Sequence, residues 1–220
     1  MVSTGDSGPT VGVLDKSLAV LAAVESGPRS LAELVVATGL SRATAHRLAV
    51  ALEGHGLLRR RPDGRFALGY RLLSLGQRAA AQIPLVEAAE PHLAALRDRT
   101  GESAQLYVRD GDERVCILAA ESAHGLRTIV TVGSRLTMAA GSAAAVLRGE
   151  SPAGTWAASV EERERGVASV SAPVVGVDGL VVAAVSVSGP VERTTRDPAP
   201  RYGPAVVEAA AAISAALRAG

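Results

Sequence analysis

The 220-residue sequence has one cysteine, one lysine and few aromatic residues. Cys116 cannot close a disulfide within the chain and has no second thiol near it for a zinc site, so a reducing compartment fits best. No apolar run approaches about 18 residues, and residues 1–10 carry neither a basic nor an apolar stretch, which argues against a membrane span and a secretory signal. We therefore expect a cytoplasmic protein in which Cys116 is a small core residue.

Motifs for catalysis and cofactors are also missing. The sequence contains no G-x-G-x-x-G or P-loop, and His55, His92 and His124 stand alone without metal-like spacing. No acid/base constellation stands out either. These absences argue against an enzyme and predict neither a cofactor nor a metal site.

What the sequence does have is aliphatic side chains and an uneven distribution of charge. Hydrophobic residues make up 48% and charged residues 20%, which is enough to bury the core of one large or two small domains. Residues 40–71 hold seven arginines against Glu53 and Asp63, a net charge of +5, so the rest of a chain with net charge +1 carries −4. This pattern indicates a module for a polyanion, with nucleic acid the first candidate, joined to a second module. The alternative is that these arginines form an ordinary solvated basic face without a binding role.

The first module reads as three short helices. Apolar residues recur at helical spacing over residues 14–24. Ser30 and Glu33 fit a capping box for a second helix, and Gly39 permits the sharp turn that ends it. Ser41 then caps a third helix. This is the sequence form of a helix-turn-helix, whose second helix enters the DNA major groove.

The outward face of the third helix and the segment after it are basic. Residues 57–68 read as two short strands joined by a Pro-Asp-Gly turn, which forms a wing beside the helix. Arginine can grip guanine through two hydrogen bonds or pair with phosphate. The alternative is an ordinary amphipathic helix with a charged outer face. The neighbouring wing favours the interpretation as a DNA-recognition helix. The predicted DNA-binding residues are Ser41, Arg42, Ala43, Thr44, His46, Arg47, Arg59, Arg60, Arg61 and Arg65.

The second module reads as an antiparallel sheet with helices on one or both sides, which makes the fold class α+β. The predicted divisions are a disordered start at 1–11, a winged helix-turn-helix at 12–69, a linker helix at 70–83 and a sheet domain at 84–220. Within the last, we expect helices at 85–99, 139–148 and 204–218 and strands at 103–108, 114–119, 126–132, 167–175 and 180–188.

Short motifs in both modules carry a resemblance to a known family. TGLSRATAHRL at 38–48 and GRFALG at 64–69 are similar to a recognition helix and wing, and GESAQL at 101–106, GVASVSAPV at 166–174 and VSVSGP at 185–190 to an effector-binding domain. With these motifs the chain resembles the IclR family of bacterial transcriptional regulators over nearly its whole length. ESAQLY, LTMAAGS and GVASVSAPV are similar to a branch linked to amino-acid biosynthesis, notably leucine genes.

The resemblance implies a winged helix-turn-helix, a linker helix and a GAF-like or PAS-like sensor domain. It implies homodimers or homotetramers on a double-stranded DNA operator at the nucleoid, a small carboxylate or amino acid as effector, and no catalysis. It places the effector among Met138, Gly141, Ser142, Ser169, Ser186 and Ser188. Ordinary strand serines, satisfied by neighbouring backbone, are the alternative for each residue.

Two departures from the family pattern keep the function open. The chain reads Ala143-Ala144-Ala145 where the family usually has Gly-Lys-Ala, and only residues 149–155 stand where relatives commonly carry a longer helical segment. Part of the wall of the sensor is therefore expected to be missing. Two alternatives remain beside an effector-controlled regulator: a constitutive DNA binder with a degenerate sensor, and a ligand-binding or interaction module that has lost specific DNA binding.

Overall fold

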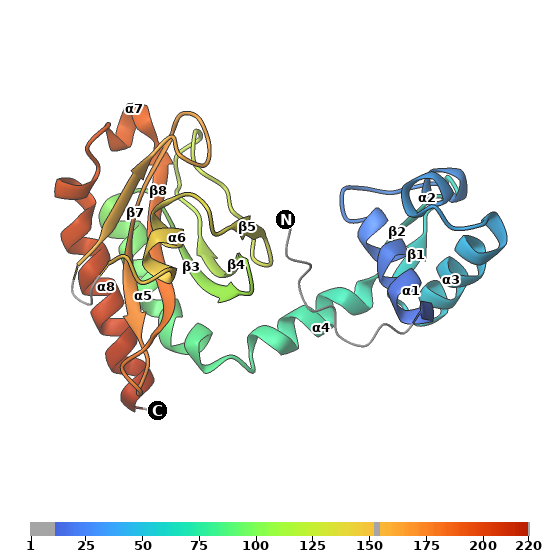
Figure 1. The fold of residues 1–220 in the computed structure, drawn as a ribbon, viewed down its shortest axis with the longest axis horizontal. Helices are drawn as coiled ribbons and strands as arrows, with labels where there is room; N and C mark the ends of the chain where they lie inside the picture. The colour runs from blue at the N-terminus through green and yellow to red at the C-terminus, as the bar shows by residue number, and fades with distance from the viewer. Residues whose placement is uncertain (1–11, 152–154, 220) are drawn as a thin grey trace, which may run out of the picture. The chain divides into compact units, whose positions relative to one another are not determined.

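The described part of the chain folds into two compact units, which are divided between Ala79 and Ala80 (Figure 1). The structure is a computed structural model that describes residues 12–151 and 155–219. The disordered start expected at residues 1–11 therefore lies outside the described residues. In the described part of the chain, no helix combines the length and the apolar character needed to cross a membrane.

The first unit holds three helices and a two-stranded hairpin. The helices are α1 (Gly12–Ala23), α2 (Leu31–Thr38) and α3 (Arg42–Gly54), and the strands are β1 (Leu58–Arg60) and β2 (Phe66–Leu68). Their core consists of Val20, Val24, Leu34, Ala49, Leu52, Leu58 and Phe66. Helix α4 (Tyr70–Ala80) follows and buries none of its residues.

The ends of α2 and α3 are fixed by the residues that the sequence singles out. The backbone N–H of Glu33 donates to Ser30 Oγ (3.3 Å), and the N–H of Ser30 donates to Glu33 Oε2 (2.6 Å), which completes the capping box. Gly39 adopts the left-handed conformation (φ 66°) that ends α2. Ser41 Oγ accepts from the N–H of Thr44 (3.3 Å) and caps α3. The predicted helix-turn-helix is confirmed in these details.

The hairpin is anchored to the helices through its second strand. Strands β1 and β2 pair in antiparallel register, with Arg60 opposite Phe66. Phe66 also exchanges both backbone hydrogen bonds with Arg29, at 2.9 and 2.7 Å, in the segment between α1 and α2. Because the Phe66 side chain is fully buried, these contacts hold the base of the predicted wing to the helical core.

The second unit is built on one antiparallel sheet of six strands in the order β5-β4-β3-β8-β7-β6. Its elements along the chain are α5 (Pro84–Thr100), β3 (Ser103–Asp110), β4 (Glu113–Ala120), β5 (Arg135–Thr137), α6 (Ser142–Leu147), β6 (Ala157–Val160), β7 (Val167–Val175), β8 (Val181–Pro190), α7 (Val191–Thr194) and α8 (Ala199–Ala219). The expected α+β fold is confirmed.

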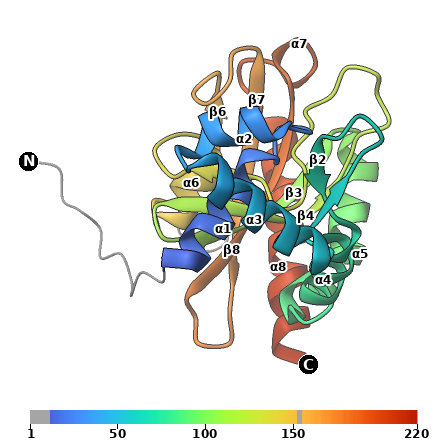
Figure 2. The same cartoon turned by 90° about the vertical axis from the view of Figure 1, so that its right-hand side faces the viewer.

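The two faces of this sheet have different chemistry. Helices α5 and α8 contact each other and cover one face (Figure 2), where Leu106, Val170 and Val185 are fully buried in an apolar core. The other face lies against the short helix α6. Because successive strand residues point to opposite faces, the serines and the glutamine that alternate with these apolar residues point towards α6.

Several predicted boundaries in the second unit are wrong. Residues 126–132 have the composition of a strand but form no ladder; the sheet continues with β5 at Arg135–Thr137, after a turn at Gly133 whose N–H donates to the Cys116 carbonyl (2.7 Å). Strand β6 and helix α7 were missed because both are only four residues long. Helix α6 begins three residues later than expected, since Gly141 has φ 98°. Helix α8 begins five residues earlier, with Pro204 accommodated within it.

Candidate nucleic-acid interface and ligand cavity

Helix α3 buries one side and exposes the other, as the sequence predicts. Ala45 and Ala49 are fully buried and Leu52 is 7% exposed. The opposite side presents Arg42, Ala43, His46, Arg47 and Val50 to solvent. Among the residues that the structure describes, the side chains of Arg42, His46 and Arg47 have no hydrogen-bond or ion-pair partner. Two guanidinium groups and an imidazole are therefore available on one helical face.

The four wing arginines do not have equal freedom. Arg59 lies over the Tyr70 ring (5.2 Å to the centroid), and Arg60 lies over the Phe66 ring (4.3 Å) and pairs with Glu53 (3.4 Å). Arg65 pairs with Glu33 (3.2 Å) and donates to the Pro28 carbonyl (3.3 Å), so it ties the wing to α2. Arg61 is exposed and has no such partner within the described residues.

Three of the wing arginines thus have contacts within the protein, which sequence patterns do not reveal because they depend on which elements meet in the fold. Glu33 is part of this arrangement. The pKa of the Glu33 carboxyl lies below its usual value, mainly because the carboxylate accepts a hydrogen bond from the backbone N–H of Ser30. The interaction with the Ser30 hydroxyl and the positive charges of Arg65 and Arg29 lower this pKa further. The predicted wing therefore has a free tip at Arg61, while Arg59, Arg60 and Arg65 hold the hairpin to the rest of the unit.

In the second unit, a row of hydroxyl groups crosses the sheet beneath α6. Ser159 on β6 is opposite Ser169 on β7, and Ser169 is opposite Ser188 on β8. A second row joins Ser171, Ser186 and Gln105, on β7, β8 and β3. Cross-strand partners share a face, so all of these polar groups gather on the side that α6 covers.

Ser142, the first residue of α6, joins the two rows. Its Oγ lies 2.7 Å from Ser169 Oγ and 2.7 Å from Ser171 Oγ, and its backbone N–H donates to Ser159 Oγ (3.1 Å). Ser171 Oγ donates to Ser186 Oγ (2.8 Å). These hydroxyls therefore bond mainly to one another. The sequence analysis predicted either serines that bind an effector or serines that bond to the neighbouring backbone, and neither prediction includes such a network.

Five of the six residues predicted for the effector come together. Gly141, Ser142, Ser169, Ser186 and Ser188 line one cavity of about 30 Å³. Met138 is not among the lining residues: its side chain is nearly buried, and its carbonyl accepts a hydrogen bond from Arg148 Nη1. A cavity of this size has room for one or two water molecules, well below the several hundred cubic ångströms typical of organic ligand pockets.

The sequence interpretation missed all five charged or aromatic residues that line this cavity: Tyr107, Arg114, Glu162, Arg163 and Glu164. Arg114 is only 3% exposed, and its Nη1 donates to the carbonyls of Thr137 and Ala140. Desolvation lowers the pKa of Arg114, and burial likewise raises the pKa of Tyr107, whose ring centroid lies 5.5 Å from the guanidinium. Arg114 and buried Cys116 are two residues apart on β4, so their side chains point to the same face of the sheet. This alternation is the signal from which the sequence could have predicted that Arg114 is buried.

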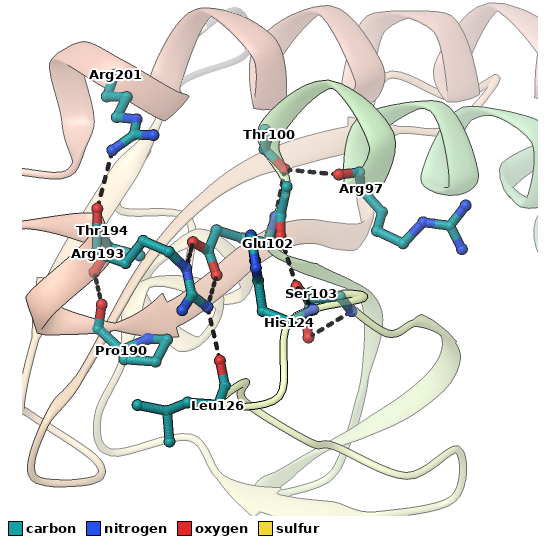
Figure 3. A network of polar contacts seen from close by, with 12 residues as sticks. Arg97, Thr100, Glu102, Ser103, His124, Leu126, Pro190, Arg193, Thr194 and Arg201 are labelled. Carbon is teal, nitrogen blue, oxygen red and sulfur yellow. Dashed lines mark hydrogen bonds and ion pairs between the residues drawn. The ribbon is translucent and has the colours of Figure 1, made fainter.

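A second polar network, shown in Figure 3, joins α7 to the start of β3. Glu102 is 1% exposed and receives two hydrogen bonds from Arg193, at 2.5 and 2.8 Å. Arg193 Nη2 also donates to the Leu126 carbonyl (2.9 Å), so the pair holds the 121–129 segment in place. A Cβ on Gly189 would lie 2.3 Å from Glu102 Oε2, so only glycine fits there. The network is buried structure rather than an open site.

The helix-turn-helix, wing and separate sheet unit define a DNA-binding transcriptional regulator. Residues 13–62 match the IclR helix-turn-helix domain, and residues 77–153 and 149–215 match the domain described as bacterial transcriptional regulator IclR C-terminal. The chain belongs to the IclR family, whose members are transcriptional regulators rather than enzymes.

Curated relatives and solved structures agree over almost the whole chain. The glycerol operon regulatory protein of Streptomyces griseus is 30% identical, with 94% of this chain and 96% of the relative covered. The transcriptional regulator KipR of Bacillus subtilis is 27% identical, with 90% and 94% covered. The fold is shared with the IclR protein of Thermotoga maritima (TM-score 0.75, 24% identity, 94% and 99% covered). It is also shared with an IclR homologue from Microbacterium hydrocarbonoxydans complexed with 4-hydroxybenzoate (TM-score 0.79, 23% identity, 95% and 100% covered).

The comparisons also bear on the short 149–155 segment. The alignment with the Streptomyces griseus protein extends over 245 positions, although it covers 94% of a chain of 220 residues. The relative therefore has residues that this chain lacks. The C-terminal domain matches in two pieces that meet at residues 149–153, which is the position where the sequence departs from the family pattern.

Proposed function

We propose that this regulator binds an operator through α3 and the wing tip, and that a small carboxylate or amino acid in the hydroxyl-lined cavity changes its operator affinity. The observation that carries the proposal is the outer face of α3, where Arg42 and Arg47 are exposed and have no partner within the described residues. A helix with two free guanidinium groups on one face suits the major groove, where arginine reads guanine O6 and N7.

The wing complements this face. Arg61 at the exposed tip would contact phosphate, while Arg59, Arg60 and Arg65 hold the hairpin through their contacts with Tyr70, Glu53 and Glu33. Ser41 and Thr44, at the start of α3, are positioned by the cap and would add hydroxyl contacts to the DNA backbone. Ala43 would contribute an apolar contact from the same turn.

The effector part of the proposal is supported by the hydroxyl face of the sheet. Gly141, Ser142, Ser169, Ser186 and Ser188 line one cavity, together with the buried guanidinium of Arg114. The homologue from Microbacterium hydrocarbonoxydans binds 4-hydroxybenzoate, an aromatic acid, which supports an organic acid as the class of effector. Met138 would contact such a ligand only after the loop before α6 moves.

Two copies of the chain would bind together, because helix-turn-helix regulators engage two half-sites one helical turn apart. A ligand that binds one arrangement of the sensor units better would shift the population and so change the spacing of the two α3 helices. We also propose homodimers or homotetramers acting at the nucleoid, with genes of amino-acid biosynthesis, notably leucine genes, among the targets.

A second candidate function is a constitutive DNA binder with a degenerate sensor. The cavity volume of about 30 Å³ and the short 149–155 segment favour it. Calorimetry with leucine and small organic acids distinguishes the two, because a constitutive binder recognises DNA without responding to any ligand.

The decisive experiment measures DNA binding by fluorescence anisotropy, using an operator selected from randomised duplexes with excess unrelated competitor. Arg47→Ala should weaken operator binding by about 1–3 kcal/mol and relax base preference at one position. Arg61→Ala should weaken binding to all sequences alike. Arg109→Ala, an exposed arginine of the sheet unit, serves as the matched control. Unchanged binding in both test variants would refute the proposed interface.

A further inference from the structure

The buried guanidinium of Arg114 is the least balanced charge at the cavity. Arg114 is 3% exposed, and no carboxylate lies within ion-pair distance among the described residues. Its Nη1 contacts only the neutral carbonyls of Thr137 and Ala140, and its Nε, also buried, has no acceptor in that part of the chain. A buried charge normally has a charged or fully hydrogen-bonded partner.

The other charged groups around the cavity are already engaged. Arg163, which lines the cavity, pairs with Glu164 (3.1 Å), and the neighbouring Arg148 pairs with Glu150 (2.6 Å). Glu162 also lines the cavity, but its Oε2 accepts the backbone N–H of Gly141 (3.0 Å) rather than binding Arg114. Arg114 is thus the buried cation at this site without a carboxylate of its own.

The backbone leaves room for a small group beside this cation. Gly141 has φ 98°, and a Cβ there would lie 3.2 Å from Arg114 Nη2, so a side chain at this position would crowd the guanidinium. Ser186, which also lines the cavity, accepts a hydrogen bond from Ser171 Oγ, and its own hydroxyl proton has no acceptor among the described residues. Cation, hydroxyl donor and open backbone together form surroundings suited to an anion.

We propose that Arg114 is the counter-ion for a negatively charged ligand of this cavity, and that the carboxylate of Glu162 opposes that ligand until it is displaced. The inference rests on the proposed function, because it specifies the charge of the effector and one residue that selects it. It favours a simple organic anion over a neutral compound. Glu162 is exposed, so solvent screens its charge and it can leave the Gly141 N–H for water more easily than Arg114 can move.

The test compares acids with their uncharged amides on the full-length protein. Isothermal calorimetry at constant ionic strength uses formate against formamide, acetate against acetamide, and glycolate against glycolamide. We expect at least one acid to bind and its amide to bind about tenfold more weakly or worse, since a charged hydrogen bond is lost. Amides that bind as tightly as the acids, or a complete absence of binding by all three acids, would overturn the proposal.

Variants show whether Arg114 carries the selectivity. Arg114→Met should remove the preference for the acid, because methionine keeps an apolar side chain of similar reach without donors or charge. Arg135→Met, on the adjacent strand β5 and exposed, is the control and should keep the preference. Should Arg114→Met not fold, Glu162→Gln answers the question, because removal of the opposing charge should tighten acid binding and leave amide binding unchanged.

Operator anisotropy in the presence of the acid keeps this inference separate from the proposed function. An acid that binds through Arg114 without changing operator affinity supports the anion site and counts against effector control. Operator affinity that responds equally to acid and amide supports effector control and overturns the role of Arg114. If Arg114 served only to hold the 137–140 loop in place, the acid and its amide would bind with equal affinity in every variant.

Discussion

The outer face of α3 and the hydroxyl face of the sheet offer polar groups in opposite ways. On α3, Arg42 and Arg47 extend into solvent, while the apolar side of the helix packs into the core of its unit. At the sheet, Ser169 and Ser171 of β7 point inwards and bond to Ser142, the first residue of α6. Surface groups can change without disturbing the fold, whereas buried hydrogen-bonded groups cannot. DNA recognition should therefore be separable from stability, and ligand recognition should not.

The largest expected effect comes from the most buried ion pair of the sheet unit. Glu102→Ala leaves Arg193 without its carboxylate and should lower the free energy of unfolding by about 3 kcal/mol. Trp156, the single tryptophan, packs against Gly203 in the same unit, so its fluorescence during urea unfolding reports on this unit specifically. Glu121→Ala, which breaks the exposed pair with Arg127, should cost less than about 1 kcal/mol. Equal losses in the two variants would contradict the assignment of Glu102 as a buried anchor.

A smaller loss should follow from the centre of the hydroxyl network. Ser142→Ala removes the partner of Ser169 Oγ and Ser171 Oγ and should lower the free energy of unfolding by about 1–3 kcal/mol. Ser134→Ala is the matched control, because the described residues provide no hydrogen-bond partner for its hydroxyl. The measurement is again urea unfolding followed by Trp156 fluorescence. A stable Ser142→Ala protein with altered ligand binding would separate stability from recognition and break the comparison above.

Sequence patterns predict the first unit well because its signals are local. The capping box of Ser30 and Glu33, the glycine turn at Gly39 and the cap at Ser41 each involve residues within four positions of one another. Such contacts depend on backbone geometry that the sequence specifies directly. The pairing of Arg65 with Glu33 spans 32 residues, and no local rule predicts it.

The second unit is predicted less completely because its site is assembled across strands. The alternation of Ser186 and Ser188 correctly indicates one shared face. The role of Arg114 could not be derived from its strand alone, because its burial depends on α6 and the 137–140 loop. The 126–132 segment shows the same limit, since its strand-like composition is overridden by contacts with other elements, including the bond from Arg193 to the Leu126 carbonyl.

Arg65 is both a predicted DNA contact and, through its ion pair with Glu33, a link between the wing and α2. Its substitution should therefore affect both DNA binding and stability. Arg65→Ala should reduce the slope of log affinity against log salt by about one and should also lower the melting temperature slightly. Arg61→Ala, at the free tip, should reduce the slope similarly with no change in melting temperature. Both quantities can be measured on the full chain, by anisotropy and by circular dichroism. A lower melting temperature for Arg61→Ala would show that the tip is not free.

The smallest expected effect concerns the acid sensitivity of the α2 cap. Since the pKa of Glu33 is lower in the folded protein, its carboxylate contributes stability that is present above the unfolded pKa and is lost as pH falls through the folded pKa. Glu33→Gln should therefore melt below the wild type at neutral pH, and the difference should shrink as the solution is acidified. Glu25→Gln, an exposed residue near the end of α1, should show no such convergence. Circular dichroism melts across the acidic range test this, and a constant difference at every pH would mean that the charge of Glu33 contributes nothing to the cap.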